Sequence, residues 1–150
     1  MNTKSTSTRA GQRALWQDWV QLWNGDYAHA DRIVSPEFRV HVALLDGTSE
    51  DAIRGPGGLT RWIKESREIF SDLKFTTKVG PLIDGQYIVG RWEATGPYKG
   101  GMPGATAAPG TDVTFTGTDL LLVRGGKIVE YWLNADSAPL LAQLGVQPVQ

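Results

Sequence analysis

The chain has 150 residues, a hydrophobic fraction of 41% and a formal net charge of −1, which together are typical of a single globular domain. This charge gives no reason to expect a nucleic acid or an anionic membrane as a partner. Because there is no cysteine, disulfides, thiolate catalysis and cysteine-ligated metals are excluded. No apolar run approaches the roughly 20 residues of a membrane span. We therefore expect a cytoplasmic protein with a disordered lead at residues 1–12 and one domain at residues 13–150.

The N-terminal half has the pattern of three helices and one strand. Apolar residues recur at helical spacing in the first and third helices, and they alternate in the strand. The expected ranges are 10–23, 27–34 and 57–70 for the helices and 38–44 for the strand. Residues 45–55 are expected to form a loop.

The C-terminal half predicts four strands in a meander followed by a short helix. Strands are expected at 73–83 and 86–95, and a hairpin with an Arg124-Gly125-Gly126 turn is expected between Phe115 and Asp136. The Gly- and Pro-rich residues 97–112 between the two pairs are expected to form a long loop. Asp136 or Ser137 is expected to cap the last helix. Helices beside an antiparallel sheet indicate an α+β fold.

Asp119 is the first candidate functional residue. Strand alternation places it in the middle of the more apolar face, between Gly117 and Leu121. A carboxylate in apolar surroundings has a raised pKa, which suits a general acid or base. A structural carboxylate that accepts hydrogen bonds from a neighbouring tryptophan is the alternative. For a catalytic Asp119 we expect the fold to tolerate Asn at this position.

The run from Asp119 through GKIVEYW to Asp136, ending in LLAQLG, resembles the C-terminal half of the SnoaL-like polyketide and ester cyclases. The segment RWEATGPYKGGMPG resembles their strand and Gly-rich loop. This family belongs to the nuclear transport factor 2-like superfamily. The resemblance therefore implies a cone-shaped domain in which N-terminal helices and a curved antiparallel sheet enclose a deep pocket. It also implies that Asp119 stands where these cyclases place a pocket histidine.

Leu133 is the informative departure from the resemblance. The catalytic aspartate of the cyclases aligns with this position, and a leucine cannot exchange a proton. The aldol mechanism that the resemblance implies therefore lacks one of its groups. Asn134 and Asp136 lie close by in sequence, but neither occupies the aligned position.

Arg91 and Glu93 are the second candidate pair, because they share a strand face. The segment from Gly85 to Glu93 is similar to the strand of limonene-1,2-epoxide hydrolase that supplies an arginine and an acid to its triad. The water-activating acid of that triad again aligns with Leu133. A cross-strand surface pair is the alternative for these two residues.

His41 is a further candidate base, since it lies within an alternating strand and histidine titrates near neutrality. The second histidine, His29, is far from it in sequence. No metal-ligand spacing, phosphate loop or dinucleotide fingerprint is present, so we expect no metal and no cofactor. The expected substrate contacts are Trp62, Tyr98, Met102, Leu121, Tyr131 and Leu133.

The resulting hypothesis is a cofactor-independent lyase, cyclase or isomerase that acts on a small apolar metabolite, aromatic or polycyclic in character. Its catalytic residues would be Asp119, His41, Arg91 and Glu93. An epoxide hydrolase and a non-catalytic ligand-binding module are the alternatives. A homodimer is expected through a sheet face that carries Leu120, Leu122, Trp92 and Trp132, opposite the pocket.

Overall fold

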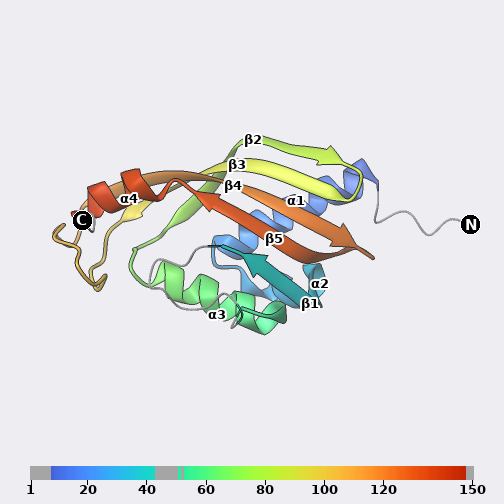
Figure 1. The fold of residues 1–150 in the computed structure, drawn as a ribbon, viewed down its shortest axis with the longest axis horizontal. Helices are drawn as coiled ribbons and strands as arrows, with labels where there is room; N and C mark the ends of the chain where they lie inside the picture. Colours follow the sequence, from blue (N-terminus) through green and yellow to red (C-terminus); the bar gives the residue numbers. More distant parts are fainter. Residues whose placement is uncertain (1–7, 43–50, 52, 148–150) are drawn as a thin grey trace, which may run out of the picture.

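The computed structural model describes residues 8–42, 51 and 53–147. They form a five-stranded sheet with α1 and α3 packed on one side of it, and α4 lies at one end (Figure 1). The helices are α1 (Arg9–Trp23), the 3-10 turn η2 (Tyr27–His29), α2 (Ala30–Ile33), α3 (Gly55–Arg67) and α4 (Ser137–Leu144). The strands are β1 (Val34–His41), β2 (Lys74–Asp84), β3 (Tyr87–Pro97), β4 (Asp112–Arg124) and β5 (Lys127–Ala135). The predicted α+β class is confirmed.

The strand order in the sheet is β1-β5-β4-β3-β2. Strands β2 to β5 form the predicted antiparallel meander. Strand β1 instead runs parallel to β5, so the sheet is mixed and not wholly antiparallel. The sheet curves and stays open, with helices across its hollow side, which is the fold that the family resemblance implied.

The first helix begins earlier than predicted, at Arg9, inside the segment expected to be a disordered lead. Gln12 is buried, and its Nε2 donates to the carbonyl oxygen of Gly85 at 2.8 Å. Residues 9–12 are therefore part of the folded domain.

Strand β1 also begins earlier than predicted, at Val34 instead of residue 38. Val34, Phe38 and Val40 are buried and lie on one face of the strand, as alternation predicts, although the pairing with β5 shifts register between Val34 and Arg39. The predicted strand end at residues 43 and 44 lies outside the described residues. Helix α3 starts at Gly55, with Pro56 in the first turn, where a missing N–H costs nothing.

The two faces of the sheet are distinguished most clearly along β3. Every second residue from Ile88 to Ala94, Trp92 among them, is buried toward the helices, and the alternate residues are more exposed. The sequence-based assignment of Trp92 to an outer, dimer-forming face was therefore wrong. Leu120 and Trp132 pair with each other across β4 and β5 and lie on the outer face, as expected.

Two glycines leave space for tryptophan rings above the sheet. A Cβ at Gly90 would overlap the indole of Trp16, and a Cβ at Gly117 would overlap the indole of Trp92. Trp16 comes from α1, so the contact at Gly90 sets how closely that helix approaches β3. Glycine is required at these positions for close approach and not for its backbone freedom.

Replacing Gly90 by Ala tests this packing. The added methyl group must displace the Trp16 ring, and overpacking of this kind costs about 1–3 kcal/mol. Urea denaturation followed by far-UV circular dichroism should show this loss of stability. Gly57→Ala in α3 is the matched control, because nothing lies within 4 Å of a Cβ there. Equal stability of the two variants would contradict the proposed packing.

Candidate functional site

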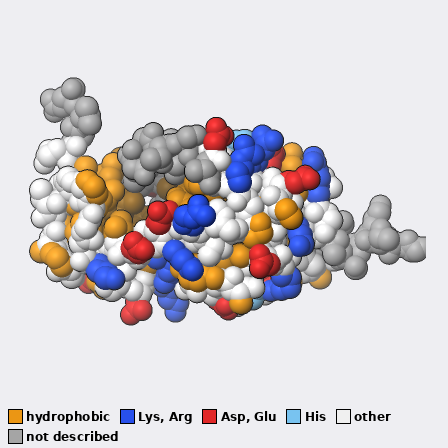
Figure 2. Space-filling view, turned by 90° about the horizontal axis from the view of Figure 1, so that it is seen from below, with side chains coloured by type: hydrophobic (Ala, Val, Ile, Leu, Met, Phe, Trp, Pro, Cys, Tyr) orange, Lys and Arg blue, Asp and Glu red, His pale blue; other side chains and the backbone are white. Residues whose placement is uncertain are grey.

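A deep pocket lies between α1, α3 and the inner face of the sheet. It encloses an empty volume of about 850 Å³, counting its open mouth. Its described wall is made largely of aromatic and aliphatic side chains from α1, α3, α4 and strands β2 to β5. Figure 2 shows a hollow in one face of the molecule, bordered in part by hydrophobic side chains. Asp119 is the one charged residue among the described residues that line the pocket.

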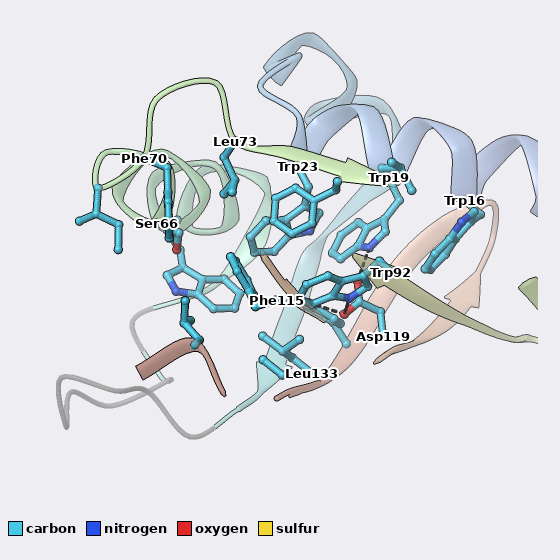
Figure 3. A pocket seen from close by; sticks show the side chains of 17 residues that line it. Trp16, Trp19, Trp23, Ser66, Phe70, Leu73, Trp92, Phe115, Asp119 and Leu133 are labelled. Carbon is cyan, nitrogen blue, oxygen red and sulfur yellow. Dashed lines mark hydrogen bonds between the residues drawn. The ribbon is translucent and has the colours of Figure 1, made fainter. Parts of the chain in front are cut away.

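Three neutral donors converge on the carboxylate of Asp119. Trp92 Nε1 and Tyr131 Oη each donate to Oδ1 at 2.9 Å. Trp19 Nε1 donates to Oδ2 at 3.0 Å. These donors come from β3, β5 and α1, so the carboxylate joins three elements of the fold. Figure 3 shows Asp119 at one end of the pocket, with the nitrogens of Trp19 and Trp92 turned toward it.

Burial raises the pKa of Asp119 to about 6, although the hydrogen bonds from Trp19, Trp92 and Tyr131 act to lower it. The acid is only 4% exposed, and the loss of hydration outweighs the three donors. Burial and the neighbouring Asp119 charge raise the pKa of Tyr131 well above its usual value. Tyr131 therefore stays neutral, while Asp119 changes charge near neutral pH.

The hydrogen bonds also indicate which oxygen of Asp119 carries the exchangeable proton. Two donors occupy Oδ1, whereas only one donor reaches Oδ2. A carboxylate oxygen has two lone pairs, so the vacant lone pair belongs to Oδ2. A proton taken up by this acid is accommodated there.

The same geometry argues against the expectation that Asn would fit well at position 119. The amide of Asn has only one acceptor oxygen, so its NH₂ group would face an indole or phenol donor. Leaving a buried donor unpaired costs about 1–3 kcal/mol. Asp119→Asn should therefore destabilise the protein unless the opposing donor is also removed.

Three of the expected substrate contacts, Trp62, Tyr131 and Leu133, line the pocket. Three others, Tyr98, Met102 and Leu121, are not part of its described lining. Leu121 is fully buried in the core. Tyr98 is also buried, and its hydroxyl accepts a hydrogen bond from the Met102 backbone at 3.0 Å.

Arg91 and Glu93 lie on the outer face of β3, opposite Asp119, so the expectation that they face the pocket was wrong. Arg91 donates to the hydroxyls of Thr116 and Thr118 and, at 2.8 Å, to Asp136 Oδ2. Glu93 Oε1 lies 4.0 Å from Lys78 Nζ in a partly exposed pair. These contacts match the surface-pair alternative.

Asp136 is held by the same outer network and does not cap α4 through its side chain. Hydrogen bonds from Thr116 and Arg91 lower its pKa.

His41 also faces outward and does not reach the pocket. Its ring stacks on Trp132 with a centroid separation of 5.1 Å, and its Nε2 lies 3.5 Å from Glu130 Oε1. The side chain of the preceding residue, Val40, is buried, so the side chain of His41 points to the opposite face of β1. The expected cluster of His41, Arg91, Glu93 and Asp119 is therefore not formed.

Sequence reasoning missed the donors Trp19 and Trp92 as parts of the site. A usable signal was present in β3, where Gly90, Trp92 and Ala94 share one face. Small residues on both sides of a tryptophan mark a face covered by other rings. Phe75 and Phe115, which also line the pocket, complete an aromatic cluster around Trp92.

The titration of Asp119 can be followed on its own donors. In a ¹H–¹⁵N spectrum, the indole resonances of Trp19 and Trp92 should shift together with a midpoint near pH 6. Trp16 is the internal control, since its Nε1 donates to Thr77 Oγ1 at 3.0 Å and not to the acid. A midpoint near pH 4, or an equal shift of Trp16, would contradict the raised pKa of Asp119.

The described helices include none that is both long and apolar enough to cross a membrane. Among the described residues, no group of three or more potential metal-ligating side chains comes together. The comparison with curated proteins gives no match.

Several solved structures share the fold over nearly the whole chain. TsrD from Streptomyces laurentii has a TM-score of 0.77 at 24% identity, over 93% of this chain and 98% of that one. IdmH from Streptomyces antibioticus, a candidate polyketide cyclase, has a TM-score of 0.76 at 24% identity, over 89% and 98% of the two chains. AclR from Streptomyces galilaeus, a candidate hydroxylase, has a TM-score of 0.75 at 24% identity, over 94% and 100%.

Identities at this level establish the fold and leave the reaction open. The model of the SnoaL-like polyketide cyclases matches residues 13–144, which is most of the chain. The protein therefore belongs to the SnoaL-like polyketide cyclase family.

Proposed function

We propose that this protein is a cofactor-independent acid–base enzyme, a cyclase, isomerase or lyase, that acts on a small and largely apolar metabolite in the pocket. One observation carries the proposal: a single buried carboxylate, with its pKa raised to about 6, closes one end of an aromatic pocket. An acid that titrates near the working pH can both accept and return a proton efficiently. Membership of a cyclase family agrees with this reading.

The composition of the described pocket wall supports an apolar ligand with a flat ring system. Trp23 and Trp62 meet edge to face at 5.3 Å, and both line the cavity. Ser66 supplies a hydroxyl, but it already donates to the Trp62 carbonyl oxygen at 2.9 Å. Few polar groups are thus left to orient a ligand, so shape and ring contacts would dominate its binding.

In the proposed reaction, the ionised Asp119 removes a proton from a carbon atom next to an electron-withdrawing group. The proton is taken up at Oδ2, the oxygen with the vacant lone pair. Trp19, Trp92 and Tyr131 hold the carboxylate in place and limit its reorientation. The electron pair left behind is delocalised into the electron-withdrawing group, and the same oxygen then returns the proton to another atom of this intermediate to give the product.

A non-catalytic ligand-binding module is the second candidate, and a specific observation favours it. Asp119 is the only group of the described pocket wall that changes charge near neutral pH, and three donors restrain it. A solitary carboxylate of this kind can also serve binding or structure alone.

Epoxide hydrolysis has less support than either candidate. The arginine and acid that the sequence similarity suggested for it, Arg91 and Glu93, lie on the outer face of the sheet. Leu133, at the position of the water-activating acid, lines the pocket without offering a base.

Deuterium exchange into 2-tetralone tests the proposed proton transfer. This bicyclic ketone has acidic hydrogens beside its carbonyl group and needs no cofactor. The protein in D₂O should accelerate exchange, with a rate that rises through pH 6 as Asp119 ionises, and EDTA should have no effect. Mass spectrometry gives the rate.

The matched variants for this assay are Trp19→Phe and the double variant Trp19→Phe with Asp119→Asn. The first variant keeps the acid. The second removes it, and because Trp19 is also replaced, the NH₂ group of the new Asn does not face an indole N–H. Loss of a general base should lower the exchange rate about 10²- to 10⁴-fold relative to Trp19→Phe. Binding of the ketone without accelerated exchange by the wild-type protein would favour the binding module.

We also propose a homodimer through the outer face of the sheet. Leu120, Trp132 and the 44% exposed Tyr87 lie close together there, and Trp132 contacts the Tyr87 ring at 6.4 Å. A cluster of partly exposed apolar side chains on a sheet face that no described helix covers is typical of an interface.

Light scattering at micromolar concentration should give the mass of a dimer. Trp132→Asp should shift it to the mass of a monomer, because a carboxylate would be buried in the interface. Arg61→Glu, on the exposed side of α3, is the control and should remain dimeric. A monomeric wild-type protein would refute this arrangement.

A further inference from the structure

The pocket has an unbalanced charge. Asp119 contributes one negative charge when ionised, and its three hydrogen-bond partners are neutral indole and phenol groups. Among the described residues of the lining there is no Lys, Arg or His. Neutral donors orient the carboxylate but leave its net charge in place. A buried anion without a counter-ion is costly, and an opposite charge nearby would relieve that cost.

The wall around this anion is built from aromatic rings in mutually steep orientations. The ring of Trp19 meets Tyr131 at 79° with centroids 4.8 Å apart, and Trp92 meets Phe115 at 87° and 5.8 Å. Ring faces carry partial negative charge and attract weakly hydrated cations. Cages of aromatic side chains are the sites that proteins use to bind quaternary ammonium groups, and rings of this kind line the pocket around Asp119.

We propose that the pocket selects an apolar ligand that carries one positive charge, a tertiary or quaternary ammonium group held beside Asp119 by the surrounding rings. This inference deepens the proposed function, because it gives the charge class of the ligand for the same pocket. It does not require Asp119 to move a proton, so it also applies if the protein only binds its ligand. Anions are disfavoured, since they would meet Asp119 without any described cation in the wall.

The affinity for such a cation should depend on pH through Asp119. The groups that face this acid are Trp19 from α1, Trp92 from β3 and Tyr131 from β5. Tyr131 stays neutral, and α3 presents Trp62 and Ser66, neither of which is charged. Asp119 is then the group whose ionisation controls cation binding. Protonation at low pH removes the attraction, while a bound cation lowers the pKa of Asp119.

The test compares two probes of the same shape, phenyltrimethylammonium and tert-butylbenzene, by quenching of tryptophan fluorescence. At pH 7.5 the cation should bind at least about tenfold more tightly than the neutral probe. This preference should fall about tenfold at pH 5, because the ionised fraction of Asp119 falls by that factor for a pKa of about 6. Benzoate, which is an anion, should not bind.

Trp19→Phe with Asp119→Asn should lose most of the preference for the cation that Trp19→Phe alone shows, because the two variants have the same rings and differ only in the charge at position 119. If the double variant fails to fold, the pH series on the wild-type protein still decides. A neutral probe that binds as tightly as the cation at pH 7.5 would overturn the inference. So would a preference that does not change with pH. Cation binding without ketone exchange would retain this inference and reject the catalytic function.

Discussion

The attachment of three neutral donors to the carboxylate of Asp119 is the interaction on which the rest of the pocket depends. Trp19, Trp92 and Tyr131 come from a helix and two strands that are far apart in sequence. Each donor must pack its ring against its neighbours to reach the acid, so the bonds and the aromatic wall form together. The acid is consequently both a structural link and the only group of the described wall that is ionised near neutral pH. The two readings of Asp119 offered by the sequence are therefore compatible.

Small residues in the sheet make this arrangement possible. Gly90 lies beside Asp119 in the paired strand, and the Trp16 ring covers it. In the same way, the Trp92 ring covers Gly117. A side chain at either position would lift a tryptophan away from the sheet and change the direction of its neighbours. The two glycines thus allow Trp16 and Trp92, which both line the pocket, to lie close against the sheet.

Much of the fold could be predicted from the sequence, because alternation and turn residues are local signals. The meander of β2 to β5 and the inward direction of Asp119 follow from such patterns. The direction of Arg91 and Glu93 did not, because alternation defines two faces without saying which one the helices cover. The outward direction of His41 was present in the pattern, because His41 alternates with the buried Phe38 and Val40. The partners of Asp119 depend on contacts up to 100 residues apart, which no local pattern contains.

The separation of charges between the two faces of the sheet limits the chemistry open to this protein. Arg91, Asp136 and two threonines satisfy one another on the outer face, and none of them is part of the described pocket wall. Inside, Leu133 stands directly opposite Asp119 in the register of β4 and β5, where a second acid would have been within reach. A single acid can take a proton from one atom and return it to another on the same side of a substrate. Hydrolysis needs an additional group that activates water, and proton relocation does not. For this reason, if the pocket is catalytic, an isomerisation or ring closure fits it better than a hydrolysis.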